Sequence, residues 1–161
     1  MNSDNSIFIH PLADVQATEI GAGTKIWQFN VVAAGARIGK NCNISAHCFI
    51  EGGAVIGDNV TLKCGVYLWD GITLESDVFV GPGALFTNDM FPRSKVYPES
   101  FLRTTVCEGA SIGAGAVLTP GITIGRHAMI AAGAVVKRDV EPFSLVLSLI
   151  HISEPTRPLY I

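Results

Sequence analysis

The sequence predicts an all-β protein, a parallel β-helix in which short strands coil around one column of inward-facing side chains. Three observations predict this fold. A large apolar residue recurs at every sixth position, a small residue precedes most of these anchors by two positions, and glycine directly follows many of them. A period of six fits neither a helical face, which repeats about every 3.6 residues, nor a long flat strand, which repeats about every two. Three such units make one triangular coil, and stacked coils bury a continuous apolar column.

Each anchor predicts one short strand. Twelve anchors follow one another without a gap from residue 20 to residue 86, and six more follow from residue 106 to residue 136. These anchors are Ile20, Ile26, Val32, Ile38, Ile44, Ile50, Ile56, Leu62, Leu68, Leu74, Val80, Phe86, Val106, Ile112, Leu118, Ile124, Ile130 and Val136.

The corners between strands are predicted from the small residues. Side chains at i and i−2 share one face of a strand, so the small residues before the anchors should also point inward. They are Thr18, Thr24, Ala36, Cys42, Cys48, Ala54, Ala110, Ala116, Ala128 and Ala134. Glycine after an anchor should let the backbone turn. This applies at Gly21, Gly39, Gly57, Gly81, Gly113 and Gly125.

One excursion loop, at about residues 87–105, interrupts the repeat. It holds two prolines, three basic residues and the pair Asn88-Asp89. Repeat proteins carry insertions as loops on one face, often the functional face. An inert excursion is the alternative, but polar groups are concentrated here in a chain that has few of them, which favours a functional loop.

Composition excludes several functions. Charged residues make up 16% of the 161 residues, the net charge is −3, and lysine and arginine do not cluster, which argues against a nucleic-acid groove or a polybasic membrane anchor. The apolar runs fall short of the ~20 residues of a membrane-spanning helix. Residues Met1–Ser6 are too polar for a signal peptide. We therefore expect one cytoplasmic domain.

The histidines and cysteines predict no metal site. Only His47 and His127 fall within the coils, whereas a zinc site of the carbonic anhydrase type would need three histidines. No two of the four cysteines have the spacing of metal ligands, and Cys42 and Cys48 should be free core thiols. His47 lies midway between two anchors and should project outward, either as a general base or as an ordinary exposed side chain. For His127 we favour the ordinary side chain.

Two stretches are more specific than the repeat itself. The first is Lys63-Cys64-Gly65-Val66-Tyr67-Leu68-Trp69-Asp70-Gly71, with Val80-Gly81-Pro82, Phe86-Thr87-Asn88-Asp89 and Pro92-Arg93-Ser94-Lys95 after it. The second spans residues 109–116 and 120–125. From about residue 7 to residue 146 the chain resembles the bacterial hexapeptide-repeat nucleotide-sugar N-acetyltransferases, which acetylate a 3-amino sugar for O-antigen or S-layer glycans. The resemblance implies a left-handed coil.

The first stretch also bears on the substrate. It most resembles the enzymes that use dTDP-3-amino-3,6-dideoxyhexoses. The related acetylases of UDP-2-acetamido-3-amino-glucuronate tend to carry two asparagines at the position of Cys64-Gly65, and they remain the alternative. An alternative of another class is a non-catalytic β-helix that binds a surface. Such solenoids show ladders of threonine, which we do not expect here. A zinc hydratase is disfavoured by the histidine count.

The resemblance implies a bacterial homotrimer that uses acetyl-CoA without a metal, with its active sites between neighbouring β-helices. Asn88 matches the asparagine of the family's loop motif and should contact the sugar amine. The chemistry suggests Asp89 or His47 to relay the proton. Other expected substrate contacts are Lys63, Trp69, Asp70, Arg93 and Lys95, of which the two loop cations suit a pyrophosphate. The implied CoA contacts are Gly115, Ala131, Ala132, Lys137 and Arg138.

The C-terminal residues depart from the family. We expect residues 1–146 to form the acyltransferase domain and residues 147–161 to form a tail outside it. The run from Ser148 to Pro158 resembles a translated sequencing adapter, and a native tail of unusual sequence is the alternative. The family's Gly-x-Pro-Ala-Lys/Arg segment is missing, so a phosphate contact to CoA and a cap on the β-helix should be lost.

Overall fold

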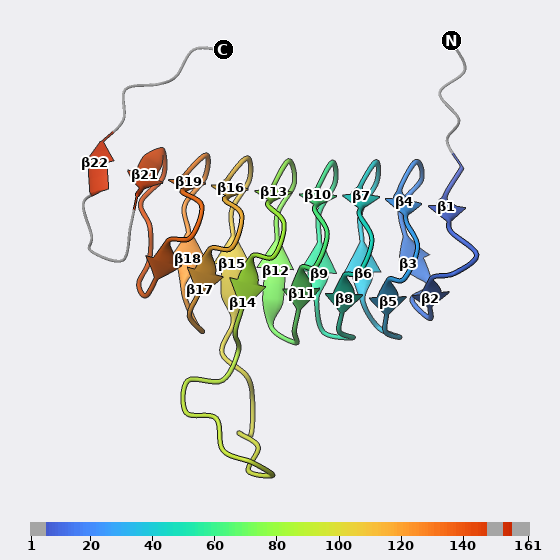
Figure 1. The fold of residues 1–161 in the computed structure, drawn as a ribbon, viewed down its shortest axis with the longest axis horizontal. Coiled ribbons are helices and arrows are strands. Elements are labelled where there is room, and N and C mark those ends of the chain that lie inside the picture. Colours follow the sequence, from blue (N-terminus) through green and yellow to red (C-terminus); the bar gives the residue numbers. More distant parts are fainter. Residues whose placement is uncertain (1–5, 148–152, 156–161) are drawn as a thin grey trace.

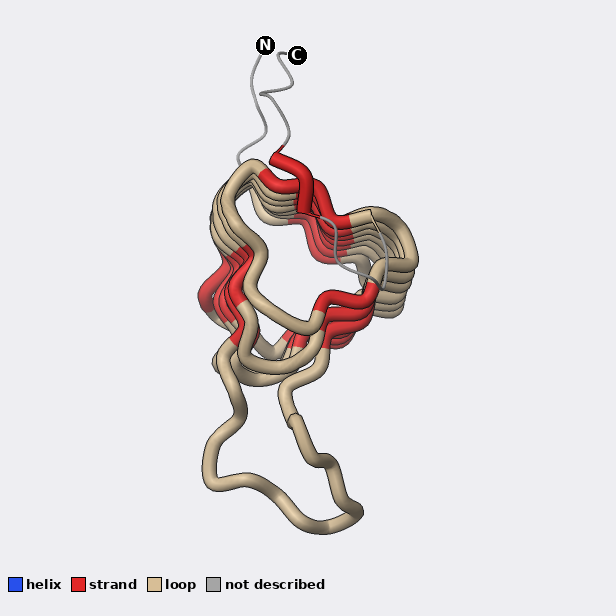
Figure 2. The backbone as a smooth tube through the Cα atoms, turned by 90° about the vertical axis from the view of Figure 1, so that its left-hand side faces the viewer, coloured by secondary structure: helices blue, strands red, loops and turns tan. Residues whose placement is uncertain are grey.

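The chain forms a three-sided parallel β-helix (Figure 1). The computed structural model describes residues 6–147 and 153–155. Successive strands belong to three sheets in turn, and the view along the coil shows three stacks of strands around one interior (Figure 2). The described residues include no helix, and so none that could cross a membrane.

The three sheets are named here in the order in which the chain visits them. Sheet A comprises β1 (Phe8–Ile9), β4 (Lys25–Ile26), β7 (Asn43–Ile44), β10 (Thr61–Leu62), β13 (Phe79–Val80), β16 (Ser111–Ile112), β19 (Met129–Ile130), β21 (Ser144–Val146) and β22 (Ser153–Pro155). Sheet B comprises β2 (Asp14–Val15), β5 (Val31–Val32), β8 (Phe49–Ile50), β11 (Tyr67–Leu68), β14 (Leu85–Phe86), β17 (Val117–Leu118) and β20 (Val135–Val136). Sheet C comprises β3 (Glu19–Ile20), β6 (Arg37–Ile38), β9 (Val55–Ile56), β12 (Ile72–Leu74), β15 (Thr104–Val106) and β18 (Thr123–Ile124).

The strand register confirms the period of six. Lys25 pairs with Asn43, and Asn43 pairs with Thr61, so one coil takes 18 residues and three strands. Phe79 then pairs with Ser111 in the same sheet, although the excursion loop lies between them. The predicted fold class, a parallel β-helix of hexapeptide repeats, is therefore confirmed. Its left-handed sense stays a prediction from the resemblance.

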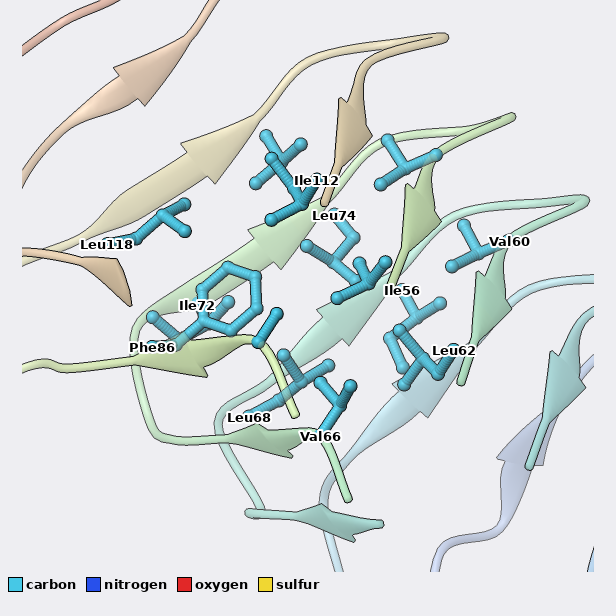
Figure 3. Packing of buried hydrophobic residues seen from close by; sticks show 14 of the residues in the cluster. Ile56, Val60, Leu62, Val66, Leu68, Ile72, Leu74, Phe86, Ile112 and Leu118 are labelled. Atoms are coloured by element: carbon cyan, nitrogen blue, oxygen red, sulfur yellow. The ribbon is translucent and has the colours of Figure 1, made fainter. Parts of the chain in front are cut away.

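The anchors form the predicted core. Every anchor except Ile20 is buried, and Figure 3 shows Leu62, Leu68, Leu74 and Ile112 pointing into one interior. Burying a side chain of this size stabilises a protein by roughly 1.5–3 kcal/mol. The stacked anchors therefore supply most of the packing in a chain whose strands are only two or three residues long.

The small inward positions are confirmed with one exception. Thr18 is exposed, and Ala17 packs against the core instead. The physical reason is the register of the first coil, where Phe8 pairs with Lys25 after only 17 residues. Because this coil is one residue shorter, the inward-facing small residue is Ala17 and not Thr18.

The two cysteines predicted in the core lie there as free thiols. Cys42 and Cys48 are both buried. Burial raises the pKa of Cys48 to about 11, so its thiol stays protonated at neutral pH. Both side chains act as small apolar residues in the column.

The reason predicted for the glycines after the anchors is wrong. The residue with positive φ lies three positions after the anchor, as at Gly65 and Gly115. Gly39, directly after an anchor, is required because a Cβ there would lie 2.5 Å from the carbonyl oxygen of Gly57 in the next coil. Glycine after the anchor therefore allows successive coils to approach, and a different residue makes the turn.

The excursion loop projects from the corner between sheets B and C (Figures 1 and 2). It spans residues 87–103 and is shorter than predicted. Thr104 and Thr105 belong to β15, where Thr104 pairs with Ile72 and is only 1% exposed. Phe91 and Tyr97 are each 81% exposed on the loop.

The expectation that no threonine ladder exists is also wrong. Thr73 pairs with Thr105, and Thr105 pairs with Thr123, so three threonines stand in one row on sheet C. The row is not apparent in the sequence because the excursion loop lies between Thr73 and Thr105. Their separation along the chain is therefore longer than one coil, although they are neighbours in the sheet. Val55 stands next in line, so the row ends there.

The predicted tail is only partly described. Residues 148–152 and 156–161 lie outside the described residues. β22, within the tail, pairs antiparallel with β21, with Leu145 opposite Glu154. The boundary at residue 146 stays a prediction.

Candidate active site

The predicted site residues lie on the two corners that border sheet B. We call the turns from sheet A to sheet B the A–B corner, and the turns from sheet B to sheet C the B–C corner. The A–B corner holds His47, Lys63, Gly115, Ala131 and Ala132. The B–C corner holds Trp69, Asp70, Asn88, Asp89, Lys137 and Arg138, with Arg93 and Lys95 on its loop.

The width of sheet B separates these two groups within one chain. About five extended residues span a strand with its flanking turns, a distance of roughly 15 Å. Asn88 therefore does not meet His47 in the same chain. Nor do Lys137 and Arg138 lie beside Ala132, although they are close to it in sequence.

Asn88 is fixed at the base of the loop. Its side-chain Nδ2 donates to the backbone oxygen of Asp70 over 3.2 Å, and its own backbone oxygen accepts from Leu102 N over 3.3 Å. Since a carbonyl can only accept, this contact requires the nitrogen of the amide and leaves its oxygen outward. Asn88 is half-buried, and that oxygen accepts no hydrogen bond from any described residue.

Trp69 and Asp70, in the coil that precedes Asn88, hydrogen-bond to the coils on either side of their own. Trp69 Nε1 donates to the Phe86 backbone oxygen over 2.9 Å, two residues before Asn88. Asp70 N donates to Glu51 Oε2 over 2.7 Å, and Asp70 Oδ1 accepts from Gly53 N over 2.5 Å. The sequence singled out Trp69 and Asp70 but missed Glu51. Glu51 is a charged residue directly after the anchor Ile50, in a chain with few charges, and this position could have marked it as a candidate.

The remaining loop residues are more open. Asp89 is half-buried, and its Oδ1 accepts from Phe91 N over 2.9 Å, which stabilises the local turn. Arg93 is exposed and donates to the backbone oxygen of Pro92 over 3.0 Å. Lys95 is exposed as well and has a φ of 59°. Both cations are therefore exposed to solvent on the loop that begins beside Asn88.

One position of the A–B corner is a glycine in four successive coils. Gly65, Gly83, Gly115 and Gly133 all have positive φ, and a Cβ on any of them would meet nothing within 4 Å. We call this row the glycine track, and it is roughly 14 Å long at about 4.8 Å per coil. Of the four glycines, only Gly115 was predicted from the sequence to contact CoA. The four glycines recur once per coil, apart from the excursion loop between Gly83 and Gly115. This spacing could have predicted the row from the sequence.

Backbone donors accompany the glycine track. Gly115 N donates to the Pro82 oxygen over 3.0 Å, and Gly133 N donates to the Ala114 oxygen over 2.8 Å, which fixes the corner. Ala114 and Ala132 are exposed, and their own N–H groups donate to no described residue. These two donors are available to a ligand lying along the track.

His47 projects from the coil as predicted. It occupies a corner with a φ of 63° and stacks on Phe29, with 5.0 Å between ring centroids. A groove of about 360 Å³ runs from this corner across sheet B to Trp69. Its lining comprises Phe29, Val31, His47, Cys48, Phe49, Tyr67 and Trp69.

From β5 to β20 the outer face of sheet B is apolar, whereas Asp14 of β2 precedes these residues in the row. Its outward residues, which we call the apolar row, are Val31, Phe49, Tyr67, Leu85, Val117 and Val135. The equivalent row on sheet A mixes Lys25, Asn43, Thr61, Phe79, Ser111 and Met129. Leu85 is 48% exposed in the single chain. An exposed apolar strip of this length is typical of an interface between proteins.

Metal ligands do not gather in the part of the chain that the structure describes. Over these residues no three His, Cys, Asp or Glu side chains lie together in a way that could hold an ion. His127 stacks on Phe143 at 5.3 Å, on the corner between sheets C and A.

The coil is built of six-residue units, with the glycine track at one edge of sheet B and the polar base of the excursion loop at the other. These are the features of a transferase built from hexapeptide repeats. The chain matches the family described as bacterial transferase hexapeptide (six repeats) over residues 17–52 and 103–138. It is 54% identical over 144 residues to the dTDP-3-amino-3,6-dideoxy-alpha-D-galactopyranose 3-N-acetyltransferase of Aneurinibacillus thermoaerophilus. That match covers 89% of this chain and 75% of the relative. The chain belongs to the bacterial hexapeptide-repeat transferases.

Solved structures share the coil. One is a variant of the GDP-perosamine N-acetyl transferase from Caulobacter crescentus with CoA and GDP-perosamine, at 25% identity and a TM-score of 0.69. The match covers 81% of this chain, and the chain spans only 56% of that protein. AntD, an N-acyltransferase from Bacillus cereus solved with dTDP and Coenzyme A, shares the fold at 14% identity and a TM-score of 0.54, over 92% of this chain and 85% of that chain.

Proposed function

We propose that the protein transfers the acetyl group of acetyl-CoA to the 3-amino group of dTDP-3-amino-3,6-dideoxy-alpha-D-galactopyranose in the bacterial cytoplasm. The observation that carries this proposal is the Asn88 side chain, whose nitrogen is held by Asp70 and whose oxygen is free to accept from an amine. The 54% identity to an acetyltransferase for that sugar supports the choice of substrate.

The chemistry requires placement more than a strong base. The lone pair of the sugar amine attacks the thioester carbon, the carbon–sulfur bond breaks, and the proton lost from nitrogen leaves with the CoA thiol. Asn88 aligns the amine by accepting one of its N–H groups, and holding the two reactants in contact supplies much of the rate. A backbone N–H at the glycine track, such as that of Ala132, stabilises the oxyanion. Asp89 is the nearest carboxylate in sequence to receive the proton.

The two substrates bind at different edges of sheet B. The glycine track leaves room for an extended acyl-CoA arm, which Gly115, Ala131 and Ala132 contact through backbone groups. The nucleotide sugar binds at the B–C corner, where Lys63 of an adjacent chain, Trp69 and Asp70 line the site and Arg93 and Lys95 meet the pyrophosphate. Lys137 and Arg138 meet the phosphates of CoA from the same corner.

Since one chain holds these two edges roughly 15 Å apart, a complete site needs two chains. We therefore propose a homotrimer in which the A–B corner of one subunit faces the B–C corner of the next. The apolar row of sheet B lies between the two corners and is the surface that subunits cover. This arrangement also places His47 of one subunit near Asn88 of its neighbour.

The interface predicts the effect of a charge on the apolar row. Leu85→Glu is expected to convert the trimer into monomers, because each subunit would bury an unpaired carboxylate against apolar side chains. Light scattering after gel filtration measures the mass. Met129→Glu is the matched control, since Met129 is 47% exposed on sheet A and lies outside the row. A trimeric Leu85→Glu would show that sheet B is not the interface.

The role of His47 is tested with asparagine, which tolerates the positive φ of this corner. If His47 of a neighbouring subunit takes the proton, His47→Asn should lower kcat at least tenfold and change the pH–rate profile, because asparagine cannot accept the proton. The control is His127→Asn, at the corner that faces no proposed site. An unchanged rate and pH profile would make His47 an ordinary exposed side chain and leave Asp89 as the acceptor.

The proposed function is tested by turnover. Purified protein is incubated with acetyl-CoA and with dTDP- and UDP-linked 3-amino sugars, and the free thiol released is measured. The dTDP-3-amino-3,6-dideoxygalactose should react fastest, and dTDP-sugars that lack the 3-amino group should not react. A trimer that binds acetyl-CoA but acetylates none of the 3-amino sugars would overturn the proposal.

A further inference from the structure

The B–C corner contains a carboxylate that the proposed reaction has not used. We propose that Glu51 is a positioning residue that sets the direction of the Asn88 amide through residue 70. This inference rests on the proposed function only for its kinetic readout. Its structural readout is independent of any turnover.

The first step in the argument is the pair of contacts between two coils. Glu51 Oε2 accepts from Asp70 N over 2.7 Å, and Asp70 Oδ1 accepts in return from Gly53 N over 2.5 Å. Each segment thus supplies one carboxylate and one backbone N–H to the other. We call these two hydrogen bonds the Glu51–Asp70 clip. Bonds from a backbone N–H to a charged oxygen are among the stronger hydrogen bonds in proteins.

The second step runs from the clip to Asn88. The clip holds the N–H of residue 70, and the carbonyl of the same residue accepts from Asn88 Nδ2. Because the clip holds both the N–H and the side chain of residue 70, it restrains the orientation of this residue and with it the carbonyl that selects which end of the Asn88 amide faces outward. Without that acceptor the amide is free to turn, and its nitrogen can replace its oxygen in the site.

The third step explains why this corner needs the clip. Gly52 and Gly53 follow Glu51, and Gly71 follows Asp70 with a φ of 89°. Of these three glycines only Gly71 lies in the turn of residue 70, which is closed by the bond from Ile72 N to the Trp69 oxygen over 3.2 Å. That bond uses neither the N–H nor the carbonyl of residue 70, and glycine leaves the backbone more freedom than any other residue. Gly52 is also required, because a Cβ there would collide with the backbone carbonyl oxygen of Ala34. The two carboxylates of the clip therefore hold groups of this corner that the turn's own backbone bond leaves unrestrained.

The fold contains a matched control for Glu51. Glu75 also directly follows an anchor, and its Oε2 accepts from Glu108 N over 2.8 Å in the next coil. That contact lies on the corner between sheets C and A, away from the excursion loop and from Asn88. Glu75→Ala therefore removes the same kind of bond between coils and leaves the proposed site intact.

The kinetic test compares Glu51→Ala, Glu51→Gln and Glu75→Ala in the full trimer. Glu51→Ala should lower kcat at least fivefold with the KM for acetyl-CoA within twofold of wild type. Glu51→Gln should restore most of kcat, because a carboxamide oxygen also accepts from Asp70 N. Glu75→Ala should keep kcat while losing a similar amount of Tm. Equal kcat values in Glu51→Ala and Glu75→Ala, or no rescue by glutamine, would overturn the proposal.

A double variant separates positioning from general damage. If Glu51 acts only through Asn88, Glu51→Ala combined with Asn88→Ala should turn over no more slowly than Asn88→Ala alone. A further loss in the double variant, equal to that of Glu51→Ala alone, would show that Glu51 acts by another route. Glu51→Met keeps the side-chain length without an acceptor, and it takes the place of alanine if that variant does not fold.

Crystal structures of the variants give the readout that needs no turnover. In Glu51→Ala the Asn88 amide should leave the Asp70 oxygen, whereas in Glu75→Ala it should stay. An unmoved amide in Glu51→Ala would overturn the positioning role even if the enzyme proved active. A wild-type protein that acetylates no 3-amino sugar would instead overturn the proposed function, and the crystallographic comparison would still decide the role of Glu51.

Discussion

Asn88→Ala is expected to lower kcat at least tenfold without changing the mass of the assembly. The variant loses the oxygen proposed to accept from the sugar amine, while the buried core and the apolar row are untouched. A tenfold loss corresponds to about 1.4 kcal/mol of transition-state stabilisation, which is modest for one oriented polar group. Steady-state rates of thiol release with the dTDP amino sugar measure the effect.

Asn43→Ala is the matched control for that variant. Asn43 stands on the outer face of sheet A, where its Oδ1 accepts from Trp27 Nε1 over 2.8 Å. Its replacement removes one side-chain bond between coils, as Asn88→Ala does, and should leave kcat within twofold. Wild-type rates in Asn88→Ala would remove Asn88 from the site and with it the main support for the proposed chemistry.

Gly39→Ala is expected to lower the free energy of unfolding by about 3 kcal/mol, near the upper end of typical overpacking costs. The new Cβ would lie 2.5 Å from the carbonyl oxygen of Gly57, which is backbone and cannot turn aside. Neighbouring coils must separate to admit it, and the strand hydrogen bonds on either side lengthen. Thermal or urea unfolding of the purified protein measures the change.

Gly65→Ala tests the same substitution where space is open. A Cβ on Gly65 meets nothing within 4 Å, so the cost is that of a positive φ alone, about 1 kcal/mol. Gly39→Ala should therefore lower Tm at least twice as much as Gly65→Ala. The reverse order would mean that backbone conformation, and not the approach of successive coils, explains the glycines after the anchors.

Much of the fold was predictable because one rule repeats along the chain. Six-residue spacing located every anchor, since each side chain needs only its own strand and the neighbouring coil to become buried. Two of the errors fell where the spacing changes. Thr18 was misplaced because the first coil is one residue short, and the row of Thr73, Thr105 and Thr123 was missed because the loop stretches one interval.

The candidate site was predicted less completely, for a related reason. Asn88, Trp69 and Asp70 stand in local motifs, and the structure links them by hydrogen bonds. Glu51 was missed because its partner lies 19 residues away in the next coil. Ala132 and Lys137 looked like neighbours in the sequence. They lie on different corners because a strand of sheet B runs between them.

The register on either side of the excursion loop has a consequence for how such proteins diversify. Phe79 and Ser111 pair as if nothing had been inserted, and the Leu102–Asn88 hydrogen bond closes the loop at its base. The length and sequence of the loop can therefore change with little effect on the stability of the coil. Under the proposed function, acceptor preference can then evolve by replacement of that segment, while the proposed donor side, built from backbone, is inherited unchanged.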